Sequence, residues 1–115
     1  MRYGLSTAFK ISACGIGVLM VGAALQAAPA PDGAAIFKQT CVMCHGANGK
    51  GMAALKTPDF TDAKWQASQK DKDLTDAIKN GRKGTAMQPF AGKLQDDEIQ
   101  ALVHYIRAFD SSKKK

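Results

Sequence analysis

Cys41-Val42-Met43-Cys44-His45 is the stretch on which the fold of this chain depends. The two cysteines are three residues apart, so their side chains lie close together if the segment forms one helical turn. The histidine follows directly and can turn its imidazole toward the same side. The pentapeptide therefore predicts a ligand that is held by two sulfur atoms and one nitrogen.

Two cysteines at this spacing followed by histidine form the attachment signature of c-type haem. Each thiol bonds to the porphyrin, and the imidazole of His45 is the proximal iron ligand. A thioredoxin-like redox pair would need a βαβ setting, which the sequence does not show. A simple disulfide would leave His45 without a role. Structural zinc needs four ligands, and the mature chain offers Cys41, Cys44, His45 and His104, two of them adjacent.

The first 27 residues have the layout of a secretory signal peptide. Arg2 and Lys10 precede an apolar run from Ile11 to Leu25, and small residues follow. We therefore expect cleavage near residue 27 and a periplasmic mature protein; an uncleaved membrane anchor is the alternative. Cys14 falls within this leader, so Cys41 and Cys44 are the two cysteines that the mature chain keeps.

The mature chain is small and mildly basic. Without the leader it keeps 14 of the 16 basic residues and all ten acidic ones, a net charge of +4. The basic residues do not cluster in a nucleic-acid-reading motif, so no nucleic-acid partner is expected. Residues 28–110 form the expected domain and 111–115 a solvated basic tail. A domain of this size gains considerably from a buried prosthetic group.

Helical signals dominate the rest of the chain and predict an all-α fold. Asp32 can cap a helix over 33–40, and a turn of helix is expected from Thr61 or Asp62 through Trp65. Asp71 can cap a further helix through Lys79. The strongest signal covers 95–109, where apolar residues recur every three or four positions. Residues 46–60 and 82–92 are rich in glycine and proline, which predicts long loops wrapped around a ligand.

Three side chains are candidates for the second axial position of the iron. Met52 lies only seven residues after His45, too near in sequence to reach the opposite face of a macrocycle. His104 falls on the polar face of the last predicted helix. Met87 is 42 residues after His45, in a loop shaped by glycine and proline, and is therefore the predicted distal ligand.

The mature chain resembles the class I monohaem cytochromes c of bacteria over essentially its whole length. Gly33 and Phe37 match the family's first helix, and Leu102 and Tyr105 match the positions on the last helix where the two helices cross. The resemblance implies a small cytochrome c fold, with three to four short helices and long loops around one covalently attached haem.

The resemblance also implies that the carbonyl of Pro58 accepts a hydrogen bond from the ring nitrogen of His45 that faces away from the iron. Leu94 and Glu98-Ile99 continue the family's pattern of a turn that leads into the last helix. In the family a proline commonly follows the ligand methionine directly. Here Gln88 intervenes between Met87 and Pro89, which is a departure from that pattern.

These features predict a monomeric single-electron carrier rather than an enzyme, with no small-molecule substrate and no membrane contact except through partner complexes or an uncleaved leader. Its redox partners are expected to carry acidic docking patches. The lysines expected near the haem are Lys50, Lys56, Lys79, Lys83 and Lys93. One alternative is a haem enzyme or gas-binding protein with an open sixth position, and another is a cytochrome subunit of a larger oxidoreductase complex.

Overall fold

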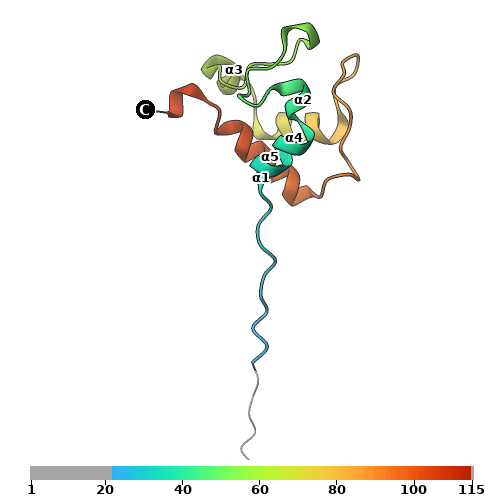
Figure 1. Cartoon of the computed structure of the whole chain (residues 1–115), viewed down its shortest axis with the longest axis vertical. Helices are drawn as coiled ribbons and strands as arrows, with labels where there is room; N and C mark the ends of the chain where they lie inside the picture. Colours follow the sequence, from blue (N-terminus) through green and yellow to red (C-terminus); the bar gives the residue numbers. More distant parts are fainter. Residues whose placement is uncertain (1–21, 115) are drawn as a thin grey trace, which may run out of the picture.

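The computed structural model describes residues 22–114, which form a helical body with a long extended N-terminal segment (Figure 1). Apart from one isolated bridge between Ala91 and Leu94, these residues contain no β-structure, so the predicted all-α class is confirmed. The helices are α1 (Gly33–Thr40), α2 (Val42–His45), α3 (Ala63–Ser68), α4 (Asp71–Asn80) and α5 (Asp96–Arg107), with 3₁₀ turns η1 (Ala53–Leu55) and η2 (Ser111–Lys113). The structure has one helix more than the three to four predicted. The additional helix is α2, which the cysteine–histidine segment forms.

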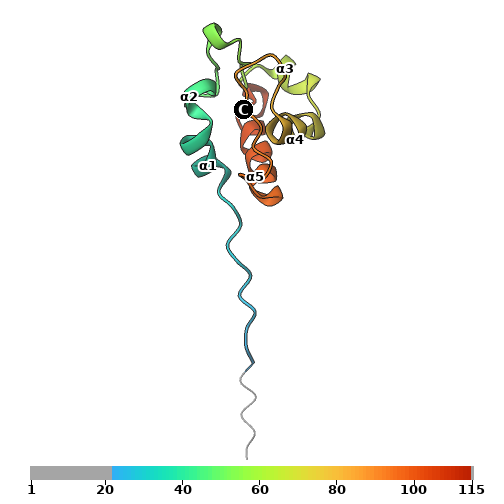
Figure 2. The same cartoon turned by 90° about the vertical axis from the view of Figure 1, so that its right-hand side faces the viewer.

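The first and last long helices, α1 and α5, cross in direct contact (Figure 2). The crossing is close because Gly33 has no side chain. A Cβ on Gly33 would lie 2.6 Å from the carbonyl carbon of Ala101. Phe37, one turn further along α1, is buried and packs its ring 5.2 Å from that of Tyr105. The crossing predicted from Gly33, Phe37, Leu102 and Tyr105 is therefore confirmed.

Helix α4 packs against another part of α5 and completes the core. Lys79 near the end of α4 pairs with Asp96 at the start of α5, with 2.7 Å between Nζ and Oδ1. In the apolar stripe predicted over 95–109, Ile99, Leu102, Val103 and Ile106 are buried, whereas Phe109 lies beyond the end of α5 and is partly buried. The buried apolar side chains of the whole core come from α1, α4, α5 and the loop before α3. They are Phe37, Phe60, Leu74, Ile78, Ile99, Leu102, Val103 and Ile106.

Capping side chains set the helix boundaries. The Asp32 carboxylate accepts a hydrogen bond from the Ala34 amide at 2.9 Å, as predicted. Asp62 caps α3, which continues three residues past the predicted end at Trp65. The prediction that Asp71 caps α4 is wrong by one residue. Lys70 is the cap position, and the Asp73 carboxylate accepts the Lys70 amide at 3.1 Å.

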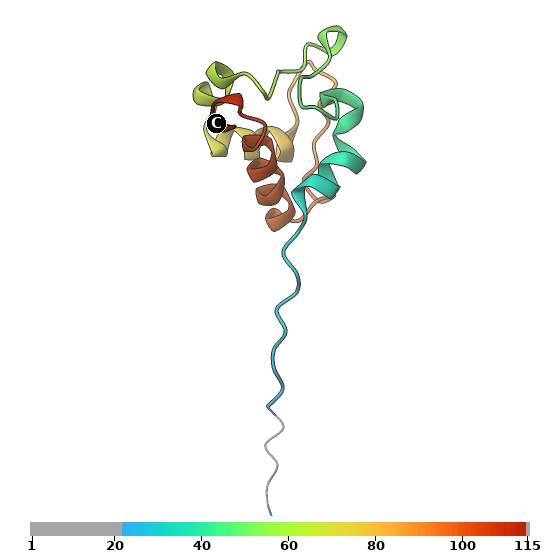
Figure 3. The same ribbon diagram turned by 60° about the vertical axis from the view of Figure 1, so that its left-hand side comes forward.

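The two ends of the described chain differ in structure. Residues 22–32 run away from the helical body, and Leu25 is 98% exposed (Figure 3). Most of the predicted leader, residues 1–21, lies outside the described residues. Between residues 22 and 114 no helix is both long enough and apolar enough to cross a bilayer. Beyond residue 110 the exposed turn η2 is tied to the domain by the Ser111 amide, which donates to the Thr61 carbonyl at 3.3 Å.

We expect Gly33→Ala to lower the free energy of unfolding by about 1–3 kcal/mol, because the added methyl group would force α1 away from α5. Denaturant unfolding of the purified holoprotein measures this loss. Ala35→Ser is the matched control, since Ala35 is exposed on the same helix. Equal stability of Gly33→Ala and wild type would show that the crossing is not tightly packed.

Candidate functional site

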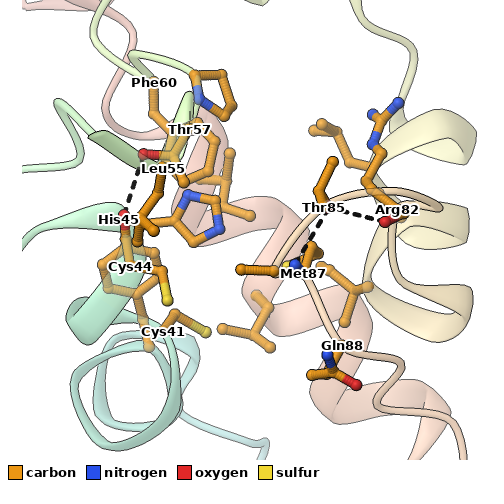
Figure 4. A pocket seen from close by; sticks show the side chains of 18 of the residues that line it. Cys41, Cys44, His45, Leu55, Thr57, Phe60, Arg82, Thr85, Met87 and Gln88 are labelled. Carbon is orange, nitrogen blue, oxygen red and sulfur yellow. Dashed lines mark hydrogen bonds between the residues drawn. The ribbon is translucent and has the colours of Figure 1, made fainter. Parts of the chain in front are cut away.

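The predicted site residues line one cavity of about 450 Å³ inside the helical body (Figure 4). Cys41, Cys44 and His45 lie on one side of the cavity, and Met87 lies on the other. Pro58 also lines the cavity. Most of the remaining lining is apolar and comes from α4, α5 and the two long loops. The structure therefore brings together residues that are up to 46 positions apart in the sequence.

The cysteine–histidine side is an extension of α1. The Cys41 amide donates to the Phe37 carbonyl at 2.9 Å, and the His45 amide donates to the Cys41 carbonyl at 2.9 Å. The chain leaves this helical turn at Gly46, whose φ of 75° favours glycine. The Thr57 hydroxyl then donates to the Cys44 carbonyl at 3.0 Å (Figure 4), which ties the following loop to the turn.

The imidazole of His45 is positioned by stacking. Its ring lies 4.8 Å from that of Phe60, with 19° between the two planes. Its Nδ1 is buried and has no hydrogen-bond partner among the described residues. The hydrogen bond expected from this ring to the Pro58 carbonyl is therefore not formed in this structure. The Pro58 carbonyl oxygen lies instead against Gly51, 2.7 Å from where a Cβ on that glycine would be.

Burial changes the acid–base properties of the cysteine–histidine side. Desolvation, helped by the neighbouring Cys44, raises the pKa of the Cys41 thiol from 9.0 to about 11. Desolvation also lowers the pKa of His45 below its ordinary value of 6.5. Near neutral pH the imidazole is therefore uncharged, which is the state in which its nitrogen can bind a metal.

The Met87 side of the cavity is a loop held by backbone hydrogen bonds to the end of α4 and across the loop itself. The Phe90 amide donates to the Ile78 carbonyl at 2.9 Å, and the Arg82 amide donates to the Met87 carbonyl at 3.1 Å. Gly81 follows α4 with a φ of 68°, and a Cβ there would lie 2.5 Å from the Met87 carbonyl oxygen. The Met87 amide also donates to the Thr85 hydroxyl at 3.1 Å. Backbone contacts thus fix the position of Met87.

The other candidate ligands lie elsewhere. Met52 is 43% exposed and does not line the cavity, and His104 is exposed on α5, as predicted. The thiols of Cys41 and Cys44 are free, so they do not form a disulfide. Within residues 22–114, no three or more His, Cys, Asp or Glu side chains are grouped so that they could hold a metal ion.

Two residues of the site were missed at the level of sequence. Phe60 was assigned only to a loop, and the hydroxyl of Thr57 was given no role. Phe60 is the one aromatic residue of segment 46–60 and lies two positions after Pro58, and this is the signal that could indicate it. Threonine in a glycine-rich loop carries no comparable signal for Thr57.

Comparison with known proteins agrees with this geometry. Residues 28–106 match the family described as "Cytochrome C oxidase, cbb3-type, subunit III". The chain is 35% identical over 88 residues to the cbb3-type cytochrome c oxidase subunit FixP of Bradyrhizobium sp. strain ORS 278, an alignment that covers 76% of this chain and 30% of that protein. It is 33% identical over 102 residues to the thiosulfate dehydrogenase electron acceptor of Stutzerimonas stutzeri, covering 82% and 45%.

A solved structure matches over almost its full length. The KustC0563 c-type cytochrome has 35% sequence identity and a TM-score of 0.65, covering 69% of this chain and 98% of that one. The fold is thus that of a small monohaem c-type cytochrome. The chain belongs to the family of cbb3-type cytochrome c oxidase subunit III. It spans less than a third of the length of the FixP subunits that it matches.

The cofactor of this class is haem c, with one iron, and the cavity fits it. The lining combines apolar side chains with two free thiols and one neutral imidazole. Among the described lining residues the full charges are cationic, on Lys56 and Arg82 at the polar edge of the cavity. These charges suit the two carboxylates that a haem carries. The chemistry of the lining therefore agrees with the family assignment.

Proposed function

We propose that this chain is a single-electron carrier in which Cys41 and Cys44 hold the haem covalently and His45 and Met87 are the axial ligands. One observation carries the proposal: a thioether and an imidazole face one apolar cavity from opposite sides (Figure 4). The haem supplies a one-electron couple between the ferric and ferrous states of its iron.

The surrounding chain keeps both axial side chains in place. On one side, stacking on Phe60 holds the imidazole of His45. On the other, the hydrogen bonds from Arg82 and Phe90 hold the backbone around Met87. With both axial positions supplied by the protein, no open site is left for a substrate or a gas. We therefore infer that the domain turns over no substrate of its own.

The proposal extends to export and docking. Of the residues that cleavage near residue 27 would remove, the described ones, 22–27, lie away from the helical body, so the folded domain would keep its contacts in the periplasm. Lys50, Lys56, Lys83 and Lys93 are exposed and available to acidic patches of redox partners. Lys79 is left out of this set because it pairs with Asp96. We expect the free domain to be monomeric.

A second candidate, a cytochrome subunit of a larger oxidoreductase complex, is favoured by the family match. FixP and CcoP are named as subunits of cbb3-type cytochrome c oxidases, and this chain aligns with part of each. The electron-transfer role is the same in both candidates. They differ in whether the domain leaves its partner, which co-purification from membranes at moderate salt would reveal.

The double variant Cys41→Ala/Cys44→Ala is expected to lose covalently bound haem, because both thioether bonds are removed. Haem staining after denaturing electrophoresis measures this loss in protein made with the haem maturation enzymes present. Met43→Ala is the matched control, since Met43 lies between the two cysteines and is 84% exposed. A stained band in the double variant would contradict the assignment of both thiols.

Met87→Ala is expected to lower the reduction potential and to abolish the long-wavelength absorption band of methionine-ligated ferric haem, because thioether ligation favours reduced iron. Optical titration with a redox mediator measures both effects. In Met52→Ala the band and the potential should stay as in wild type, since Met52 does not line the cavity. A band that persists in Met87→Ala and disappears in Met52→Ala would reverse the ligand assignment.

The wild-type protein is expected to give a reversible one-electron wave in voltammetry, and its ferrous form should not bind carbon monoxide. Both results follow from two protein ligands on the iron. Electron exchange with an acidic partner should slow as ionic strength rises, because salt screens the docking lysines. Rapid carbon monoxide binding by the wild type would instead favour the enzyme or gas-binding alternative.

A further inference from the structure

A buried polar network on the side of α3 adjoins the His45 side of the cavity. Its centre is Gln66, which is only 3% exposed. The Gln66 Nε2 group donates to the Phe60 carbonyl at 2.7 Å and to the Ile106 carbonyl at 2.9 Å. Its Oε1 accepts from Arg107 Nη1 at 2.9 Å. Both donors and the acceptor of this side-chain amide are therefore used.

Arg107 in turn fixes the segment that carries Gln66. Besides the Gln66 side chain, its guanidinium donates to the carbonyls of Gln66 at 2.7 Å and Gln69 at 2.6 Å. Its Nε pairs with the Asp71 carboxylate at 2.7 Å. A single side chain from the end of α5 thus holds the end of α3 and the start of α4, and it is only 19% exposed.

The network ends at the residue that stacks on the proposed iron ligand. The Phe60 backbone is held on both sides, because its amide donates to the Gly49 carbonyl at 2.7 Å and its carbonyl accepts from Gln66. The Phe60 ring is 4% exposed and lies against His45. His45 Nδ1 has no hydrogen-bond partner among the described residues. Two aromatic rings lie near the imidazole: Phe60, stacked on it at 4.8 Å, and Phe37, tilted and further away at 6.5 Å.

We propose that Gln66 and Arg107 are positioning residues for His45, acting through Phe60. Arg107 holds Gln66, Gln66 holds the Phe60 carbonyl, and the Phe60 ring sets the rotation of the imidazole about its bond to the iron. The inference rests on the proposed role of His45 as iron ligand. Hydrogen-bonded partners usually orient a metal-binding histidine. In this inference, a network of hydrogen bonds and one aromatic ring have that role.

The test uses the ferric holoprotein and reads the orientation of the imidazole plane. The hyperfine-shifted haem methyl resonances in NMR depend on that orientation. We expect Gln66→Leu to displace or broaden them and to shift the reduction potential, because the variant leaves the Phe60 carbonyl without its donor. Arg107→Lys should give a smaller change of the same pattern, since it keeps the charge but loses the planar set of donors.

Two controls separate positioning from general loss of stability. Gln100→Leu removes an exposed amide whose hydrogen bond goes to Thr75, away from Phe60. Ile99→Val lowers stability by removing a methyl group from a fully buried residue that does not line the cavity. Neither variant should move the methyl resonances. A third measurement is made in a Phe60→Leu background, where Gln66→Leu should add no further shift.

The outcomes are distinct. The inference is overturned if Gln66→Leu alters only the unfolding free energy, or if its spectral shift is undiminished in the Phe60→Leu background. If Gln66→Leu does not accumulate as folded protein, the Arg107→Lys variant is used for the test. Unchanged haem methyl resonances in Arg107→Lys would then overturn the inference. If wild-type spectra survive His45→Ala, the proposed function fails instead, because His45 would not then be the ligand.

Discussion

The contact of α1 with α5 at Gly33 is the constraint on which the rest of this structure depends. The backbone of α1 lies almost against the carbonyl of Ala101, so α1 has a fixed direction where it enters the site. Cys41 continues that helix by its bond to Phe37, and the turn to His45 follows. The helix crossing therefore sets the direction in which the backbone enters the Cys41–His45 turn. The Thr57 hydroxyl adds a second restraint on this turn, through its hydrogen bond to the Cys44 carbonyl.

The two sides of the cavity are built on different principles. The His45 side combines a continuous helix with a cluster of aromatic rings, in which Phe60 contacts His45, Trp65 and Phe109. The Met87 side is a loop whose shape comes from backbone hydrogen bonds to α4. The apolar area buried by the helix and the packed rings stabilises the His45 side. The position of the Met87 loop depends instead on a few hydrogen bonds. The Met87 side is thus the part of the site with the lower local stability.

Hydrophobic periodicity and short motifs in the sequence predict most of this fold. They do not predict where side chains in the loops lie. The stripe of Ile99, Leu102 and Val103 identified the last helix because a buried face must repeat at the helical period. The sequence predicts the N-cap of α4 one residue too late, at Asp71 instead of Lys70. Asp71 and Asp73 are both acidic residues near the helix start, and the sequence does not show which of them interacts with the N-cap. The family pattern predicts a hydrogen bond from His45 to the Pro58 carbonyl, but His45 Nδ1 has no hydrogen-bond partner among the described residues. Gln66 gave no signal, since an amide on a short helix looks like any solvated residue.

The crossing of the first and last helices also bears on the order in which the protein is assembled. A chain made from its N-terminus presents Cys41 and Cys44 well before α5 exists, and the cavity cannot close without α5. Thiolate is the reactive form of cysteine, and a rise in the Cys41 pKa from 9.0 to about 11 on closure reduces its thiolate fraction by roughly 100-fold near neutral pH. The open chain would therefore be the better substrate for the thioether bonds proposed at Cys41 and Cys44. Topology and acidity together favour cofactor attachment first and helix docking afterwards.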